Sequence, residues 1–582
     1  MLKEWAVQQL KEHVDLSEEQ LAGMLEFPPR ADLGDIAFPC FALAKSWRKA
    51  PADIAGEIAQ RIAGQTVEQR TGSDDGKPDC RVAAAGPYIN FFYRSPERID
   101  SLLAAVLHPE FATSQEGRGK RVVVDFSSPN IAKPFGIGHL RSTMIGNALA
   151  NMYQLSGWEV VRINHIGDWG TQFGKLLSAY SRWGNDRAME ADPIKESLRL
   201  YVQFHEEAEQ DPLLEEEARE WFRKLENQDK DALALWWHFI EMSLREFSKV
   251  YARLGVEFDH TLGESFYNDK MDSVVAMLQE QQLLEESDGA MVVRLDEHNI
   301  PPCLILKSDG SSIYATRDLA TAFYRKNEMG ADKLLYVVGG EQKLHFEQVF
   351  GVLGKLGQEW VEQCEHVAFG MMRYEGKKMS TRKGRVVFLN EVLDEAIAKA
   401  EEVIAAKNPA LAGRSEIAEA IGIGAVVFGD LKHNRMMEAD FVLEEALRFE
   451  GETGPYVQYT HARAMTLLEK GAAEPSAATG KGSAVPDSAA GQFLTGEEAW
   501  ECLKQLDVFP LRVAEAVRLN EPSIVARYML EVAKSFNRFY HQERIITEDV
   551  EERQAKLLLT AAVAKVLKTG LGLLGIKAPR QI

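Results

Sequence analysis

Four residues within one short stretch have the types and spacing to bind a nucleotide: Lys133, Gly136, Gly138 and His139. The stretch follows Arg121-Val-Val-Val124, an apolar run typical of a buried parallel strand. It precedes residues 140–155, where apolar side chains recur at helical spacing. At such a strand-to-helix turn, free N–H groups and the helix dipole favour phosphate, and glycine lets the backbone approach a flat base closely. We therefore expect a nucleotide at this turn.

Two further strands extend this unit into a sheet. Residues 158–163 predict a strand after the helix, which completes a βαβ unit, and residues 333–338 predict another buried strand. Gly339-Gly-Glu-Gln342 follows the latter at its carboxyl end, where ligands of open α/β sheets bind. Neither a GxxxxGK[ST] nor a GxGxxG pattern follows a strand, which excludes an ordinary P-loop or dinucleotide site.

A second stretch, from Gly376 to Gly384, concentrates positive charge. Its sequence is Gly-Lys-Lys-Met-Ser-Thr-Arg-Lys-Gly, with four cations among the seven residues between the glycines. Such a loop can wrap a triphosphate, and a donor used mainly in the transition state is typically worth about 10²–10³ in rate. Taken alone, the cluster also fits a solvated basic surface loop.

Both stretches resemble motifs of class I aminoacyl-tRNA synthetases. Gly136-Ile-Gly-His139 resembles the HIGH signature, Ser128-Pro-Asn-Ile-Ala-Lys133 resembles the arginyl-tRNA synthetases in particular, and the cationic stretch resembles the KMSKS loop. Gly136 stands where HIGH has its first histidine, and Thr381 stands where KMSKS has its second lysine. We expect the remaining donors of the turn to make the phosphate contacts, with reduced dependence on position 136 rather than loss of activity.

The resemblance implies ATP-dependent joining of L-arginine to tRNA(Arg) through an arginyl-adenylate, with release of pyrophosphate and AMP. It assigns catalytic roles to His139, Lys378, Arg382 and Lys383. It assigns ATP binding to Lys133, Gly136, Gly138, His139, Lys378, Met379 and Ser380, and arginine binding to Asp125, Asn130, Tyr314, Asp318 and Gln342. Mg²⁺ would arrive through the ATP phosphates, and we expect neither a protein metal site nor a structural zinc.

The residues assigned to arginine suit a guanidinium group. A planar carboxylate accepts paired N–H bonds, Tyr314 and Asp318 share one face of a predicted helix at i,i+4 spacing, and Asp125 ends the first strand. Seen singly, Asp318 could be a solvated helix charge and Asn130 a turn former.

Two other segments also match the family. Residues 164–173 contribute His165 and Gln172 as expected ligand contacts, while Gly167 and Gly170 are expected to form a turn. Residues 263–267 match as well, without an assigned role.

Three domains are expected. Residues 1–115 predict an α+β domain that by resemblance binds the tRNA elbow, and residues 116–390 predict an α/β catalytic domain of the Rossmann type with a parallel sheet. The latter would contain a helical insertion at about 183–262, whose aromatic residues we interpret as helix packing. Residues 391–582 predict an all-helical stem and anticodon-binding domain, interrupted by a flexible loop at 471–491.

Composition sets the outer limits. The 582 residues, 45% hydrophobic and 27% charged, fit a globular protein of several domains. A net charge of −21 argues against RNA, yet much of the acidity falls in segments such as 206–220, so a basic track can coexist with it. Five scattered cysteines form no CxxC pair, which argues against zinc and disulfides. We expect a cytoplasmic monomer without a membrane span.

Two rival interpretations remain open. The first is a class I synthetase for another amino acid, such as lysine, glutamate or cysteine; two candidate acids argue against glutamate, and the absence of paired cysteines argues against cysteine. The second is a non-catalytic paralogue that binds arginine or tRNA. His139 and Lys378 argue against that paralogue, because binding alone does not need cations directed at phosphate.

Overall fold

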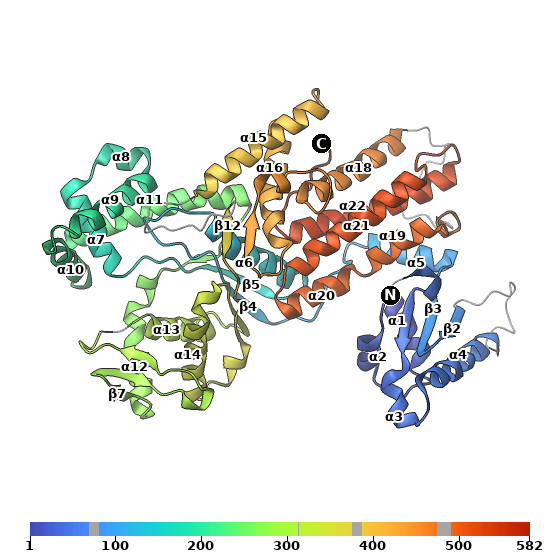
Figure 1. Cartoon of the computed structure of the whole chain (residues 1–582), viewed down its shortest axis with the longest axis horizontal. Coiled ribbons are helices and arrows are strands. Elements are labelled where there is room, and N and C mark those ends of the chain that lie inside the picture. Colours follow the sequence, from blue (N-terminus) through green and yellow to red (C-terminus); the bar gives the residue numbers. More distant parts are fainter. Residues whose placement is uncertain (29, 69–80, 312, 375–386, 474–489) are drawn as a thin grey trace.

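The structure is a computed structural model that describes residues 1–28, 30–68, 81–311, 313–374, 387–473 and 490–582. Figure 1 shows three regions in chain order: a small α+β region, a central region built on a parallel sheet, and a long helical region. The predicted fold class is confirmed. No helix in the described ranges combines the length and the apolar character needed to cross a membrane.

The central sheet has five parallel strands in the order β11-β10-β4-β5-β6. Their bounds are β4 Arg121–Asp125, β5 Glu159–Asn164, β6 His260–Thr261, β10 Lys333–Tyr336 and β11 Cys364–His366. β4 is fully buried over its three valines, as its apolar run predicts, and helix α6 (Gly138–Leu155) connects it to β5. Since β10 and β5 flank β4 on opposite sides, the strand order reverses beside β4, where ligands of such sheets bind.

A helical insertion follows β5 and projects to one side of the sheet (Figure 1). It comprises α7 Thr171–Trp183, α8 Asp186–Ala191, α9 Pro193–Ala208, α10 Leu213–Glu226 and α11 Lys230–Leu254. Phe239 of α11 packs edge-on against Tyr180 of α7, with ring centroids 5.4 Å apart, and Trp236 packs edge-on against Trp169 at 5.6 Å, so these aromatic side chains form packing contacts. Trp237 is the exception, because 59% of it is exposed.

A second insertion, between β6 and β10, has a separate hydrophobic core. It contains η3 Glu264–Lys270, α12 Met271–Glu280, β7 Glu285–Ser287, β8 Ala290–Val293, η4 Asp296–His298, β9 Cys303–Leu306 and α13 Tyr314–Asn327. Its three strands form an antiparallel sheet of their own. After β10 come η5 Gly340–Gln342, α14 Lys343–Lys355 and η6 Glu359–Gln363.

The N-terminal region is a three-stranded antiparallel sheet covered by helices, with strand order β1-β3-β2. Its elements are α1 Leu2–Leu10, α2 Glu18–Met24, η1 Ala31–Leu33, β1 Ile36–Pro39, η2 Cys40–Leu43, α3 Ala44–Trp47, α4 Pro51–Glu68, β2 Arg81–Ala85, β3 Tyr88–Phe92 and α5 Pro96–Leu107. Figure 1 shows this region on the side opposite to the helical insertion, next to α19.

The C-terminal region is helical, as expected, apart from one short strand. The helices are α15 Leu389–Lys407, α16 Arg414–Leu431, α17 Leu443–Ala446, α18 Gly454–Ala473, η8 Ala490–Phe493, α19 Glu497–Asp507, α20 Phe509–Leu519, α21 Ser523–Gln542 and α22 Val550–Leu573. β13 (Ala439–Phe441) pairs in parallel with β12 (Met372–Tyr374), and this two-stranded ladder joins the helical region to the central one.

Candidate active site

The carboxyl ends of β4 and β10 meet the start of α6 through one side chain. Ser142 of α6 accepts a hydrogen bond from the N–H of Ser127, just after β4, at 2.9 Å and donates one to the carbonyl of Val337, just after β10, at 2.7 Å. Helix α6 therefore begins at the sheet edge where the sequence places the nucleotide.

The turn between β4 and α6 is strained and braced from the insertion. Ser127, Ser128 and Ala132 have positive φ angles of 72°, 47° and 58°, a conformation that costs energy outside glycine. The hydroxyl of Ser127 lies 2.8 Å from that of Tyr251, and the N–H of Ala132 donates to Ser243 at 3.0 Å. Since both partners belong to α11, the insertion holds the turn in shape.

Asn130 packs against a glycine that the sequence marks as a turn. The two segments form a parallel bridge between Asn130 and Gly167, and a Cβ atom on Gly167 would lie 2.2 Å from Asn130 Oδ1. Only glycine lets these two segments approach this closely. Asn130 is half-buried and lies beyond the carboxyl end of β4.

His139 opens α6 and is half-buried beside Phe135, with ring centroids 5.1 Å apart. Its Nδ1 lies 3.2 Å from the N–H of Gly136, so the two candidate residues of the turn contact each other. Burial, assisted by the nearby charge of Lys133, lowers the pKa of His139 below its usual value. A neutral imidazole at pH 7 can form hydrogen bonds with phosphate but supplies no positive charge.

Lys133 also lies in this turn, and its resemblance to the family predicts that it binds ATP. Its Nζ donates to Gln172 Oε1 at 3.1 Å and lies 5.8 Å from the ring of Tyr201. Gly138 is exposed at the first position of α6, with no atom within 4 Å of a built Cβ. The helix terminus is therefore accessible to a ligand.

The cationic stretch lies outside the described residues, and with it the predicted site residues Lys378, Met379, Ser380, Arg382 and Lys383. Its flank is described on the carboxyl side. The N–H of Ile137 donates to Val387 O at 3.1 Å, and the N–H of Leu389 donates to Phe135 O at 3.0 Å. The segment that follows the cationic stretch therefore pairs directly with the turn between β4 and α6.

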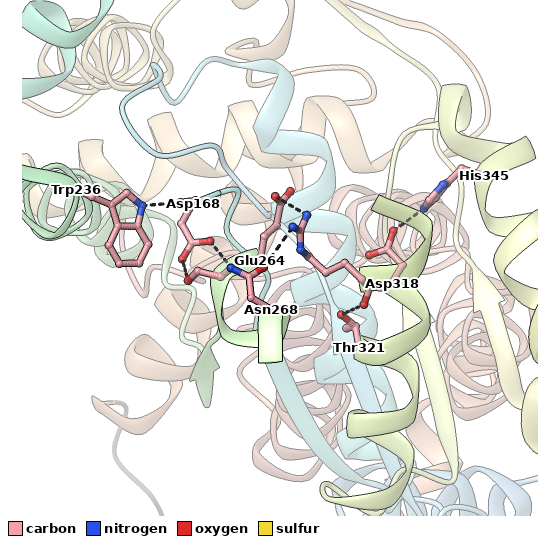
Figure 2. A network of polar contacts seen from close by, with 9 residues as sticks. Asp168, Trp236, Glu264, Asn268, Asp318, Thr321 and His345 are labelled. Atoms are coloured by element: carbon pink, nitrogen blue, oxygen red, sulfur yellow. Dashed lines mark hydrogen bonds and ion pairs between the residues drawn. The ribbon is translucent and has the colours of Figure 1, made fainter. Parts of the chain in front are cut away.

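A group of acids lies beside the turn, on α13 and η3 (Figure 2). Glu264 Oε2 accepts from Arg317 Nη1 at 3.3 Å, and Arg317 Nη2 donates to Asn268 at 3.3 Å. On α13, Asp318 Oδ2 contacts His345 Nε2 of α14 at 2.5 Å. The site thus already holds one guanidinium, that of Arg317, between polar side chains.

Asp168 completes the acidic group. Its carboxylate accepts from the N–H of Ser265 at 2.8 Å and from the Ser265 hydroxyl at 2.6 Å, and its carbonyl accepts from the indole N–H of Trp236 (Figure 2). A Cβ on Gly263 would lie 2.0 Å from Asp168 Oδ2, so this glycine permits the contact.

Burial and mutual repulsion change how these groups titrate. Burial raises the pKa of Glu264 to about 7; Arg317 opposes the shift, while Asp318 and Asp168 reinforce it. Burial also raises the pKa of Asp168 and lowers that of His165. A cation placed among these carboxylates would relieve their repulsion, which is the electrostatic requirement of a guanidinium site.

Asp125, the other candidate acid, has a partner within the protein. The Asp125 carboxylate is buried and forms an ion pair with Arg325 of α13 at 2.8 Å, and it also accepts from the Ser128 hydroxyl at 3.1 Å. Its charge is therefore already balanced by the protein. Arg325 was missed in the sequence, although it follows Asp318 by seven positions and so lies on the same helix face.

Tyr314 and Gln342 occupy open positions. Tyr314 is 60% exposed at the first turn of α13, where it lines a cavity of about 470 Å³ together with Trp169, Gly170 and Arg317. Gln342 is exposed in η5, after β10. Glu264 and His345 were also missed as site residues; the family match at 263–267 was the available signal for Glu264.

The chain matches three family models that follow one another. Residues 2–93 match "Arginyl tRNA synthetase N terminal domain", residues 101–443 match "tRNA synthetases class I (R), catalytic domain", and residues 457–582 match "DALR anticodon binding domain".

Related proteins and a solved structure are similar to this chain over nearly its whole length. The chain is 50% identical over 570 residues to arginine–tRNA ligase 1 of Bacillus thuringiensis subsp. konkukian, covering 98% of this chain and 97% of that protein. It is 48% identical over 577 residues to the arginine–tRNA ligase of Clostridium perfringens, covering 99% and 98%. The Thermus thermophilus arginyl-tRNA synthetase structure superposes with a TM-score of 0.80 at 27% identity, covering both chains completely.

Proposed function

The chain belongs to the class I arginyl-tRNA synthetases, and from this membership we propose that it joins L-arginine to tRNA(Arg) with ATP. In the first step, a carboxylate oxygen of arginine attacks the α-phosphorus of ATP, the bond to the β-phosphate oxygen breaks, and pyrophosphate leaves. In the second, a hydroxyl of the 3′-terminal ribose attacks the arginyl carbonyl and AMP leaves. No covalent intermediate with the enzyme is needed.

The nucleotide contacts fall to the turn before α6. The exposed start of this helix at Gly138 and Lys133 would face phosphate, and His139 would contribute hydrogen bonds as a neutral imidazole. We assign Lys378, Arg382 and Lys383 to the charge that develops as pyrophosphate leaves, with Met379 and Ser380 at the nucleotide. The pairing of residues 135–137 with 387–389 supports this assignment, because it anchors the end of the cationic stretch at the turn.

The acidic side chains on α13 and η3 would determine the specificity for arginine. Asp318 and Glu264 would accept the substrate guanidinium, with Tyr314 at the mouth of the adjoining cavity. Asn130 and Gln342 lie at the sheet edge, where they would face the amino and carboxylate groups of the substrate. Asp125 would bind arginine while paired with Arg325, whose positive charge balances the negative charge of the Asp125 carboxylate.

Mg²⁺ would be held mainly by the ATP phosphates. Among the described residues, no group of three or more His, Cys, Asp or Glu side chains is arranged to hold a metal ion, and Mg²⁺ commonly keeps substrate phosphates and water as ligands. When bound, it would neutralise phosphate charge. We further propose that the enzyme acts as a monomer, without zinc, and in the cytoplasm, where its proposed substrates are found.

The test is ATP–pyrophosphate exchange with each amino acid, with and without tRNA. Arginine should be the only amino acid that supports pyrophosphate exchange. Lys378→Ala should abolish this exchange while tRNA binding persists. Exchange with lysine but not with arginine would mean that the enzyme is specific for lysine. Absence of exchange under every condition would favour the non-catalytic paralogue that binds arginine or tRNA.

A further inference from the structure

Residues 367–370, which we call the strip, lie between β11 and β12. This backbone segment borders the sheet edge on which the substrates are proposed to bind. The N–H of Val367 donates to Tyr336 O, and the N–H of Gly340 donates to Phe369 O, both at 2.9 Å. Since Gly340 begins the turn that carries Gln342, any displacement of the strip displaces that turn.

Two arginines hold the other side of the strip. Arg435 donates from Nη1 to Ala368 O, and Arg141 donates from one nitrogen to Gly370 O and Met437 O, each at 2.7 Å. The N–H of Gly370 donates to Arg435 O at 2.8 Å, and a Cβ on Gly370 would lie 2.8 Å from Met436 O. The strip is therefore closely packed on this side as well.

Each arginine is anchored on a different part of the molecule. Arg435 donates from Nε to Asn520 O at 3.0 Å, and its N–H lies 3.3 Å from the Glu521 carboxylate. These two partners form the turn between α20 and α21, inside the range that matches the anticodon-binding model. Arg141 lies on α6 and pairs with Asp430 of α16 at 2.9 Å.

We propose that Arg435 is a positioning residue for arginine activation, through which the helical C-terminal region sets the place of the strip and of the sheet edge beside it. The inference rests on the proposed function, because it takes tRNA as the ligand that docks on that helical region. The guanidinium of Arg435 donates to a backbone carbonyl on each side, so a shift of the α20–α21 turn is passed to the strip through this one planar group.

The probe is Arg435→Gln in the full-length protein. The side chain of Arg435 is 15% exposed, whereas Arg141 and Asp430 are 1% exposed, and removal of one member of that pair would leave a buried charge. A matched control is Arg553→Gln on α22, since Arg553 is also buried and donates to carbonyls, Thr547 O at 2.8 Å, but does not touch the strip.

With tRNA present, Arg435→Gln should lower the kcat of arginine-dependent pyrophosphate exchange roughly 10–100-fold, as expected for a misplaced reacting geometry. KM for ATP and the Kd for tRNA should each change by less than about twofold, because the displaced turn carries Gln342, which is assigned to arginine and not to ATP or tRNA. Arg435→Lys should behave like the glutamine variant, since lysine carries its donors on one atom at the end of a flexible stem and cannot reproduce the two fixed positions of Nε and Nη1 that reach Asn520 O and Ala368 O. Arg553→Gln should retain the wild-type kcat.

A second readout does not depend on activity. Amide hydrogen exchange of residues 367–374 should be faster in Arg435→Gln than in the wild type, and unchanged in Arg553→Gln. Three results would each overturn the proposal: unchanged amide hydrogen exchange of residues 367–374 in Arg435→Gln, a wild-type kcat in Arg435→Lys, or an equal loss of kcat in Arg553→Gln. Absence of arginine-dependent exchange in the wild type would overturn the proposed function instead, and the amide readout would still decide the role of Arg435.

Discussion

Asp318 gains its significance from its neighbours rather than from its own residue type. It contacts His345 and acts on the neighbouring carboxylate of Glu264, so it belongs to an acidic group although its side chain is 26% exposed. Asp318→Asn should raise KM for arginine roughly 10–100-fold, because a charged hydrogen bond is worth about 1.5–3 kcal/mol, while KM for ATP should change little.

The measurement is steady-state pyrophosphate exchange with either substrate varied. Asp272→Asn is the control, since it removes the same charge from an exposed position on α12. An equal rise in both Michaelis constants would remove Asp318 from the guanidinium site.

Glu264 predicts a pH dependence for arginine binding. Burial raises its pKa to about 7, so the carboxylate that would accept the guanidinium forms only as the pH rises through neutrality. The kcat/KM for arginine should therefore increase between about pH 6 and 8, and Glu264→Gln should flatten that rise. A wild-type profile that is flat over this interval would contradict the assignment.

The same group also affects stability. The folded protein holds the Glu264 proton more tightly than the unfolded chain does, so its contribution to stability is present in acid and is lost as the pH rises toward about 7. Glu264→Gln should remove this loss in unfolding measurements at several pH values.

At the scale of elements, Gly370 shows how close two segments must come. A side chain there would meet the backbone of Met436 and Met437 at 2.8 Å, so β12 or the segment before β13 would have to move. Gly370→Ala should cost about 1–3 kcal/mol in the free energy of unfolding and should also lower exchange activity.

Gly354→Ala serves as the comparison in denaturant unfolding. It lies within α14, nothing approaches a built Cβ within 4 Å, and alanine favours helix over glycine. The substitution should be neutral or stabilising by about 0.5–1 kcal/mol. Similar destabilisation by both substitutions would show that contact with the backbone is not the cause.

At the scale of the molecule, one buried aspartate links the N-terminal region to the C-terminal helical region. Asp35 accepts from the indole of Trp500 at 2.6 Å, pairs with Lys504 at 3.3 Å and accepts from the N–H of Tyr93 at 2.7 Å. It is 7% exposed, so Asp35→Ala leaves the indole of Trp500 and the N–H of Tyr93 without this partner, while Lys504 keeps its ion pair with Glu501. The expected cost is about 3–5 kcal/mol, as for breaking a buried pair.

Hydrogen exchange would locate that cost. Protection should fall in β1 and β3 and in α19, while β4 and β10 keep theirs. The control is Asp32→Ala, whose pair with Arg30 is largely exposed and should contribute less than about 1 kcal/mol. Uniform loss of protection over the whole chain would argue against a local tie.

Local patterns were enough to predict the strand, turn and helix over residues 121–155. Backbone hydrogen bonding, apolar spacing and the conformational freedom of glycine act between near neighbours, and they are legible in the chain itself. The order of the motifs likewise indicated the family and the fold class, both of which are confirmed.

Only the tertiary structure decided which partner each charge has. Nothing near Asp125 in the chain indicates that Arg325, two hundred positions away, neutralises it, or that Glu264 and Asp318 share one acidic group. Pairing and burial set the energy of a charge, and both depend on segments that meet only after folding. The sequence by itself therefore determined which residue types reach the sheet edge, while packing determined which of them can receive a cation.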